Sequence, residues 1–211
     1  MVFVYAADIS ELPDPLLQPD VMQGISSSRK EKILSFRQVN DRKRCLGAGI
    51  LLNQILSIYG KDTENIYYNK NGKPQIDGIF FNLSHAHHMV ICAVSSMEVG
   101  CDIEWVESGM EHIAKNYFSH RECTYLQETC EELRLHEFFR LCTMKESYVK
   151  MTGEGMSLGL DTFEVDFSDK PEIYRKGVRC SCFLREYDIP GYKMTVCAQE
   201  SEFDDLVTVE I

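Results

Sequence analysis

The sequence of 211 residues contains no apolar run of about 18 residues, which is the shortest length that usually spans a membrane. Residues 1–8 carry no positive charge ahead of their apolar stretch, so we expect a first strand there instead of a signal peptide, and a cytoplasmic protein. Positive charge is scarce overall, because 22 Lys and Arg face 33 Asp and Glu, a net charge of −11. We therefore expect neither a membrane nor a nucleic acid as a partner.

Cysteine is plentiful, at nine residues, but the paired spacing of a zinc site is missing. Only Cys180 and Cys182 form a tight pair in the sequence, and no second pair accompanies them at zinc spacing. Others, such as Cys92 and Cys197, sit inside apolar runs, where a free thiol behaves as a small hydrophobic group. We therefore expect free cysteines, in keeping with a reducing cytoplasm.

One segment departs from the acidic average. Residues 29–44 concentrate positive charge in seven side chains: Arg29, Lys30, Lys32, Arg37, Arg42, Lys43 and Arg44. The charge pattern alone leaves two interpretations open, a solvated helix face and an anion-binding surface.

Helical spacing and turn residues define the first part of the chain. Serine N-caps and apolar residues at helical spacing predict helix over residues 26–59, with a break near 39–41. Residues 69–74 are rich in Asn, Gly and Pro, which predicts a turn.

The second part of the chain carries similar signals. Ser119 and Glu122 match a capping box, which predicts a helix start. Residues 131–151 predict a further helix, which Gly153 is well placed to end. Short apolar runs predict strands over residues 89–94, 99–103, 161–167 and 192–198.

Two short segments resemble each other. Residues 89–93 read Met-Val-Ile-Cys-Ala and residues 194–198 read Met-Thr-Val-Cys-Ala. Short apolar runs coincide by chance, but this echo also fits a chain of two similar halves. We place the halves at residues 1–106 and 107–211.

Three carboxylates stand out as candidate metal ligands. Asp102 and Glu104 lie two residues apart on a predicted strand, so their side chains share one face. Glu146 falls inside the apolar stripe of a predicted helix, where an unpaired carboxylate is costly. Together they suit a hard cation such as Mg²⁺. The alternatives are an edge strand that faces solvent without metal, and a salt bridge from Glu146 to a base such as Lys150.

His85 is a candidate phosphate contact. It follows Ser84 just before a predicted strand, so we expect a loop that presents it to a ligand. His87 and His88 follow closely, which raises a transition-metal cluster as an alternative, although no Cys or acid lies nearby at ligand spacing.

Taken in order, six segments resemble the surfactin-type 4′-phosphopantetheinyl transferases. They are Gly72-Lys73-Pro74, Phe81-Asn82-Leu83-Ser84-His85, Val99-Gly100-Cys101-Asp102-Ile103-Glu104, Phe118-Ser119 with Glu122, Met144-Lys145-Glu146-Ser147 with Lys150, and Gly153-Glu154-Gly155. The resemblance runs from about Arg29 to Ala198. Two departures from the family pattern are Leu141-Cys142-Thr143, where many members show Trp, and Ala86, where Ser is commoner.

The resemblance implies a role for each candidate residue. Asp102, Glu104 and Glu146 would bind Mg²⁺. Contacts to the coenzyme A phosphates and nucleotide would come from Ser84, His85, Lys73, Arg29, Lys32 and Arg44. Lys150 would neutralise or protonate the departing 3′,5′-ADP. Glu122 is a candidate general base for the acceptor serine, with a metal-bound water as the alternative.

The resemblance also implies a fold and a reaction. The fold would be α+β, a pseudodimer of two similar halves with the active site in the cleft between them, and the protein a monomer. The reaction would move 4′-phosphopantetheine from coenzyme A to a serine of an apo acyl or peptidyl carrier protein, with Mg²⁺, releasing 3′,5′-ADP. Two other interpretations stay open: a Mg²⁺-dependent hydrolase of phosphoesters or nucleotides, and a non-catalytic module that binds coenzyme A or a carrier protein.

Overall fold

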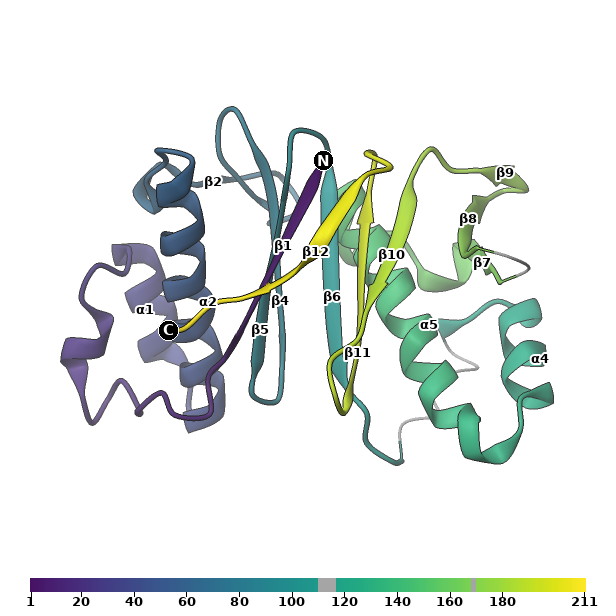
Figure 1. Ribbon diagram of the computed structural model, residues 1–211, viewed down its shortest axis with the longest axis horizontal. Helices are drawn as coiled ribbons and strands as arrows, with labels where there is room; N and C mark the ends of the chain where they lie inside the picture. The colour runs from purple at the N-terminus through teal and green to yellow at the C-terminus, as the bar shows by residue number, and fades with distance from the viewer. Residues whose placement is uncertain (110–116, 168–169) are drawn as a thin grey trace.

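Two β-sheets stand side by side in the middle of the molecule, with helices on both outer sides (Figure 1). The computed structural model describes residues 1–109, 117–167 and 170–211. Helices α1 (Ser27–Ser35) and α2 (Val39–Ile58) cover one side, and α4 (His120–Glu128) and α5 (Glu131–Thr152) cover the other. The predicted α+β class is confirmed.

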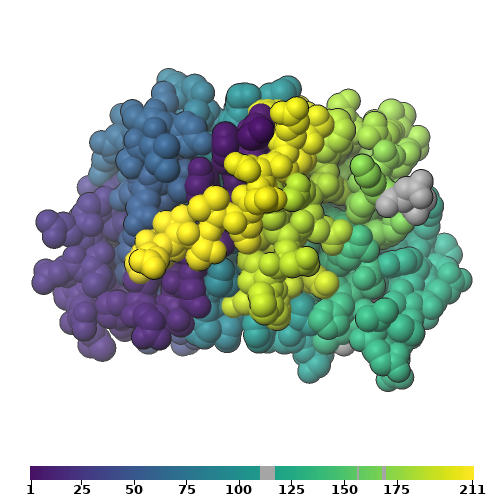
Figure 2. Space-filling view, in the orientation of Figure 1, coloured from purple at the N-terminus to yellow at the C-terminus, as the bar shows by residue number. Residues whose placement is uncertain are grey.

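The first sheet has the strand order β12-β1-β5-β4. Its strands are β1 (Val2–Asp8), β4 (Phe80–Ala86), β5 (Met89–Ser95) and β12 (Phe203–Thr208). Strand β5 runs antiparallel to β1 and β4, whereas β12 runs parallel to β1. Leu52 and Ile55 of α2 pack on Val90 and Val94 of β5, which buries one face of this sheet. In Figure 2 the C-terminal residues cross the front of the molecule from the second half onto the first.

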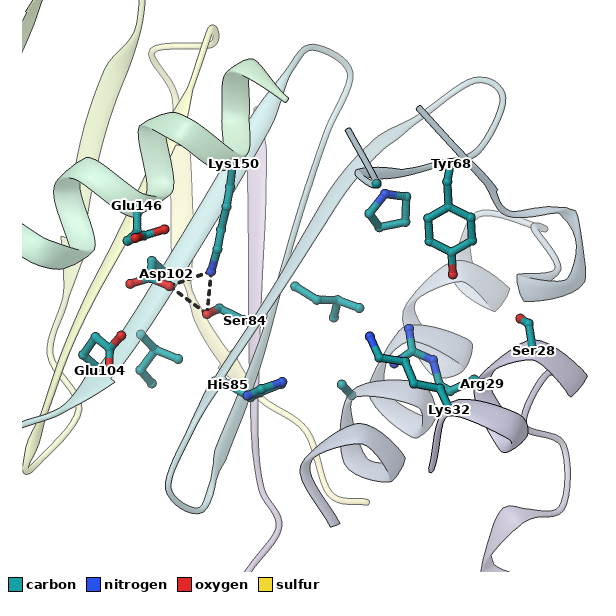
Figure 3. Close-up of a pocket in the computed structure, with 15 residues that line it drawn as sticks. Ser28, Arg29, Lys32, Tyr68, Ser84, His85, Asp102, Glu104, Glu146 and Lys150 are labelled. Carbon is teal, nitrogen blue, oxygen red and sulfur yellow. Dashed lines mark hydrogen bonds and ion pairs between the residues drawn. The ribbon is translucent and has the colours of Figure 1, made fainter. Parts of the chain in front are cut away.

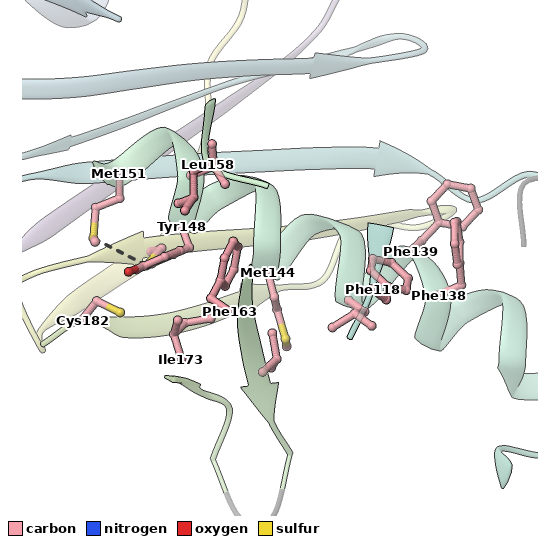
Figure 4. Close-up of a cluster of buried hydrophobic side chains, with 14 of the residues drawn as sticks. Phe118, Phe138, Phe139, Met144, Tyr148, Met151, Leu158, Phe163, Ile173 and Cys182 are labelled. Atoms are coloured by element: carbon pink, nitrogen blue, oxygen red, sulfur yellow. Dashed lines mark hydrogen bonds between the residues drawn. The ribbon is translucent and has the colours of Figure 1, made fainter. Parts of the chain in front are cut away.

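The second sheet has the order β10-β11-β6 and is antiparallel throughout. Its strands are β6 (Val99–Trp105), β10 (Phe183–Tyr187) and β11 (Tyr192–Ala198). Helix α5 is buried on almost every side, because it lies between this sheet and a cluster of aromatic and sulfur-containing side chains (Figure 4).

The two halves share one connectivity. The series β1, α2, β4, β5 in the first half has the same neighbour order as β6, α5, β10, β11 in the second. The two similar segments at 89–93 and 194–198 lie in β5 and β11, each of which runs between two neighbours. The division at residue 106 stays a prediction, because β6 joins the second sheet and β12 returns to the first.

Short elements complete the chain. Strands β2 (Tyr67–Tyr68) and β3 (Pro74–Gln75) form a hairpin around the predicted turn, in which Gly72 has a φ of 84°. A three-stranded sheet contains β7 (Phe163–Asp166), β8 (Glu172–Arg175) and β9 (Val178–Arg179). Short 3-10 turns occupy Pro19–Met22, Thr63–Asn65, Gly155–Ser157 and Leu160–Thr162.

The predicted helix ends are confirmed, but the break lies at residues 36–38 and not at 39–41, because α2 already begins at Val39. The break between α1 and α2 is fixed by Arg42, whose guanidinium donates to the carbonyls of Phe36 and Arg37 at 3.0 and 2.8 Å. The Ser119–Glu122 capping box opens α4, and Gly153 ends α5 with a φ of 67°. Within the described ranges, every helix is too short or too polar to cross a membrane.

The free edges of the two sheets meet where β4 faces β6. The Asn82 side chain of β4 accepts a hydrogen bond from the Cys101 amide of β6 at 3.0 Å. On the outer side, Gly100 lets β6 approach α5 closely, because a Cβ there would lie 2.1 Å from the Ser147 carbonyl oxygen. Strand β6 is therefore clamped between the first sheet and α5, and it carries two of the candidate carboxylates.

Candidate active site

A cavity of about 510 Å³ opens along this junction, and we call it the site cavity (Figure 3). Its walls come from α1, α2, the β2–β3 hairpin, β4, β6 and α5, so both halves contribute. The residues that line it are Ser28, Arg29, Lys32, Ala48, Tyr68, Gly72, Pro74, Leu83, Ser84, His85, Asp102, Ile103, Glu104, Glu146 and Lys150.

One end of the site cavity is acidic. Asp102 and Glu104 reach it from β6, because alternate residues of a strand share a face. Glu146 reaches it from α5. The structure thus brings together the three predicted carboxylates, although β6 and α5 are well separated in the sequence.

Lys150 binds this acidic end to β4. Its ammonium donates to Asp102 Oδ1 at 2.6 Å and to Ser84 Oγ at 2.9 Å. The Ser84 hydroxyl donates in turn to Asp102 Oδ1 at 2.9 Å. Burial lowers the pKa of Lys150, but the Asp102 carboxylate more than offsets this, so the pKa is raised and the charge is retained. The alternative that the sequence left open was a salt bridge from Glu146 to Lys150, whereas the structure pairs Lys150 with Asp102.

The carboxylates repel one another in a poorly hydrated space. Burial, helped by the nearby Asp102 and Glu146 charges and opposed by Lys150, raises the pKa of Glu104 to about 7. Burial and Asp102 also raise the pKa of Glu146. The acidic end therefore holds more negative charge than Lys150 neutralises, which favours binding of a cation.

The chemistry of these groups fits a hard cation. Asp102 is 3% exposed, and its Oδ2 atom is buried without a hydrogen-bond partner among the described residues. A buried carboxylate oxygen in that state is costly, and coordination to a metal would satisfy it. Within residues 1–109, 117–167 and 170–211, no group of three Asp, Glu, His or Cys side chains lies close enough together to hold a metal ion. This is also true of the site cavity. Glu104 and Glu146 would have to turn toward Asp102 to complete such a site.

The other end of the site cavity is basic. Figure 3 shows Arg29 and Lys32 extending from α1 on the side opposite the carboxylates. The Arg29 chain crosses α2 at Gly49, where a Cβ would lie 2.5 Å from Arg29 Cδ. Glycine is therefore required for Arg29 to reach the cavity, which gives part of the basic cluster a specific position.

His85 lies between the two ends (Figure 3). The predicted loop is wrong here: His85 belongs to β4, whose pairing with β5 continues to Ala86 opposite Met89. The strand still presents the imidazole to the cavity. Desolvation lowers its pKa, and the positive charges of Arg44, Lys150 and Lys32 add to that effect.

Comparison with known proteins identifies the family. The family model of the 4′-phosphopantetheinyl transferase superfamily matches residues 98–197. A 4′-phosphopantetheinyl transferase of Bacillus subtilis is 34% identical over 194 residues, which cover 88% of this chain and 87% of that one. The chain belongs to the 4′-phosphopantetheinyl transferase superfamily.

Two further relatives cover most of their own length. The transferase Sfp of Bacillus subtilis (strain 168) is 33% identical over 89% of this chain and 88% of its own. The transferase gsp of Aneurinibacillus migulanus is 31% identical over 86% of this chain and 79% of its own. This phosphopantetheinyl transferase is thus similar to these relatives over most of its length.

Two residues predicted as phosphate contacts in this transferase lie outside the site cavity. The Lys73 side chain is only 8% exposed, and its ammonium donates to Glu98 Oε2, the Val99 carbonyl and the Met151 carbonyl at 2.6, 3.2 and 2.8 Å. Arg44 donates to Asp41 Oδ1 at 2.5 Å. Their roles as phosphate contacts stay predictions.

Glu122, the predicted general base, also lies outside the site cavity. Its carboxylate is 1% exposed and forms an ion pair with Lys145, at 2.6 and 2.7 Å to its two oxygens. The amides of Ser119 and Val165 donate to the same carboxylate, both at 2.8 Å. Every oxygen of Glu122 is engaged in holding α4, α5 and β7 together, so its catalytic role stays a prediction.

Sequence reasoning missed several residues that build the transferase site. Ser28 and Tyr68 line the basic end of the cavity and carried no distinctive signal. Gly100 did carry a signal, because a glycine inside a strand marks a close backbone approach. Lys145 carried another, since a lysine on a largely apolar helix requires a buried partner.

Proposed function

We propose that this protein transfers 4′-phosphopantetheine from coenzyme A to a serine of an apo acyl or peptidyl carrier protein, in a Mg²⁺-dependent reaction that releases 3′,5′-ADP. The observation that carries the proposal is the distribution of charge in the site cavity. Arg29 and Lys32 lie at one end, three carboxylates lie at the other, and Lys150 lies beside the carboxylates. Coenzyme A has phosphates in two places, a 3′-phosphate on its ribose and a pyrophosphate, which matches two separate regions of the cavity.

The basic end would bind the nucleotide. Arg29 and Lys32 are the side chains that we assign to the 3′-phosphate, because both are cationic and both line the cavity. Ser84 and His85 lie between this end and the carboxylates, so we assign them to the pyrophosphate. Together these contacts would fix the position of the phosphorus to be attacked.

The acidic end would bind Mg²⁺ through Asp102, Glu104 and Glu146. Mg²⁺ bound there would neutralise negative charge on the pyrophosphate oxygens and polarise the phosphorus. The unpartnered Asp102 Oδ2 supports this assignment, as does the excess of negative charge around Glu104. Lys150, which holds Asp102 Oδ1, would then be free to donate to a phosphate oxygen.

The transfer itself exchanges one bond to phosphorus for another. The carrier serine Oγ bonds to the phosphorus that bears pantetheine, and the bond from that phosphorus to the oxygen of 3′,5′-ADP breaks. Negative charge gathers on the departing oxygen, and Lys150 would stabilise or protonate it. The serine proton leaves at the same time. Glu122 stays a prediction as its acceptor, and its buried ion pair gives that role no support.

A second cavity offers room for the pantetheine arm. It has a volume of about 280 Å³ and adjoins the first, because Glu146 and Lys150 line both. Leu83, Pro74 and Val149 give its walls an apolar character that suits an uncharged arm. Both cavities are built within one chain, so we expect the monomer to be active.

The direct test is intact-mass spectrometry of an apo carrier protein incubated with this protein, coenzyme A and Mg²⁺. The expected result is a gain of one phosphopantetheine that EDTA abolishes. Glu146→Gln removes a proposed metal ligand at nearly constant volume, so it should abolish transfer while the fold persists. Glu131→Gln, at an exposed position of the same helix, is the matched control and should retain transfer.

Other outcomes would replace the proposal. If coenzyme A is degraded without modification of any carrier, a Mg²⁺-dependent hydrolase explains the site better. If coenzyme A binds intact and no carrier gains mass, the protein is a binding module.

A further inference from the structure

The hairpin between β4 and β5 contains a residue in an unfavourable backbone conformation. His87 has a φ of 48°, in the left-handed region that non-glycine residues seldom adopt. Lys176, with a φ of 52°, is the one other non-glycine residue with positive φ in the described ranges. A glycine would fit the two-residue turn at lower cost. Turn geometry therefore does not explain why position 87 is a histidine.

The His87 ring stacks on Trp105 of the second sheet. The ring centroids are 4.8 Å apart and the planes meet at 20°. Trp105 is the last residue of β6 and directly follows Glu104. An aromatic contact thus joins the end of the first sheet to the end of the strand that carries two proposed metal ligands.

The hairpin between β10 and β11 also contacts Trp105. Gly191 lies so close that a Cβ there would be 2.4 Å from Trp105 Cζ3. Tyr192 contacts the indole edge-on, with centroids 4.8 Å apart. The Tyr192 hydroxyl also accepts a hydrogen bond from the His88 amide at 3.3 Å. We call His87, Trp105, Gly191 and Tyr192 the aromatic clasp.

We propose that the aromatic clasp fixes the β6 backbone at Glu104, so that the Glu104 carboxylate enters the site cavity beside Asp102 and Glu146. Neighbouring side chains on a strand point to opposite faces, so fixing the Trp105 ring aims the Glu104 carboxylate into the site cavity. The Glu104 side chain forms no hydrogen bond or ion pair with other described residues, so its direction depends on its backbone. His87 is a positioning residue in this view, because it acts through Trp105. The inference rests on the proposed function, since it takes Glu104 as a metal ligand.

The test uses three single variants. His87→Asn removes the ring and keeps a residue that tolerates positive φ. His87→Tyr keeps an aromatic ring and should restore the contact. Lys176→Asn is the matched control, because Lys176 occupies an equivalent left-handed position in the two-residue turn between β8 and β9 and is exposed.

Two readouts separate positioning from a general effect on the fold. Trp105 is the single tryptophan, so its fluorescence and its quenching by acrylamide report the clasp directly. The second readout is the Mg²⁺ concentration at half-maximal effect, measured both by Trp105 emission on the protein without substrates and by transfer with saturating coenzyme A.

We expect His87→Asn to increase acrylamide quenching and to raise the half-maximal Mg²⁺ concentration about two- to tenfold, the range that the loss of one aromatic pair gives. The rate at saturating Mg²⁺ and the KM for coenzyme A should stay near those of the parent. His87→Tyr should recover most of the change and Lys176→Asn should show none. An unchanged half-maximal Mg²⁺ concentration in His87→Asn would overturn the proposal.

A failure of the proposed function is distinguishable from a failure of this inference. If the parent protein modifies no carrier, the Mg²⁺ titration of Trp105 emission still tests the clasp, and a shift in His87→Asn supports it. If the parent protein binds no Mg²⁺ at all, both the metal site and the positioning role are wrong.

Discussion

Two lysines on α5 form ion pairs with carboxylates from other elements, and the two pairs differ in how fully they are satisfied. Lys145 and Glu122 are 0% and 1% exposed. The Lys145 ammonium donates to both Glu122 oxygens and to the Phe163 carbonyl, and two backbone amides complete the carboxylate. No donor or acceptor in that pair is left over for a ligand.

The pair of Lys150 and Asp102 is incomplete by comparison. Lys150 is 28% exposed and lines the site cavity, while Asp102 Oδ2 has no partner among the described residues. The two lysines lie five positions apart on α5. Nevertheless, the Lys145 pair is fully hydrogen-bonded, whereas the Lys150 pair can accept another charge. We therefore expect Lys145 and Glu122 to hold the structure together, whereas Lys150 and Asp102 belong to the proposed reaction site.

The largest loss of stability should come from breaking the fully hydrogen-bonded Lys145–Glu122 pair. Lys145→Met would leave the Glu122 charge buried without its partner, so the free energy of unfolding should fall by about 3–5 kcal/mol. Urea denaturation measures the change. A control is the double variant Lys145→Met with Glu122→Leu, which removes both charges and should recover much of the loss. If Lys145→Met is as stable as the parent, the pair does not hold the fold.

Breaking the incomplete Lys150–Asp102 pair should have a different effect. Lys150→Met should slow transfer about 100- to 1000-fold, the usual cost of removing one group that stabilises developing charge. Because Asp102 then lacks its competing cation, Mg²⁺ at one fixed concentration should stabilise this variant more than Lys145→Met, whose metal site is unchanged, by about 1.4 kcal/mol for each tenfold gain in affinity. Thermal unfolding with and without Mg²⁺ measures this. Equal responses of Lys150→Met and Lys145→Met to Mg²⁺ would remove the distinction between the two pairs.

The close approach of β6 to α5 supports the Lys150–Asp102 pair, because that pair joins these two elements. Gly100→Ala would place a Cβ 2.1 Å from the Ser147 carbonyl oxygen. We expect a loss of about 3 kcal/mol in unfolding free energy, the upper end of ordinary overpacking, together with slower transfer. Urea denaturation and the carrier assay give the two values. A variant that loses stability but keeps full transfer would show that the site tolerates movement of β6.

Lys73 extends the comparison to a third lysine. Its ammonium is satisfied by Glu98 and two carbonyls, as that of Lys145 is by Glu122 and one carbonyl. Lys73→Met should therefore lower the free energy of unfolding by about 1–2 kcal/mol, with less than a threefold change in the KM for coenzyme A. A much larger rise in KM at unchanged stability would support the predicted phosphate contact instead.

Much of the fold could be predicted from the sequence because it depends on interactions between residues that are close in the chain. The Ser119–Glu122 capping box, the glycine at the end of α5 and the alternation of Asp102 and Glu104 each depend on residues within a few positions of one another. Such features can be predicted because their energies are decided within one element.

The limits of sequence reasoning lie in contacts between distant segments. Glu122 was correctly placed at a helix start, but its pairing with Lys145 depends on how α4 packs on α5. A carboxylate in a cavity and a carboxylate in a core look alike in sequence. The strand position of His85 was missed for a similar reason, since the pairing of β4 with β5, and not the local residues, extends the strand.

The pairing of β12 with β1 has a consequence for how this protein folds. Val2 and Phe203 are neighbours in a parallel pair, although they lie near opposite ends of the sequence. The first sheet therefore gains β12 only after residues 203–208 have been synthesised. Contacts of such long range slow folding and leave the edge of β1 exposed in the meantime. Folding of the first sheet on the ribosome would thus stay incomplete until β12 has emerged, and the two sheets should unfold together.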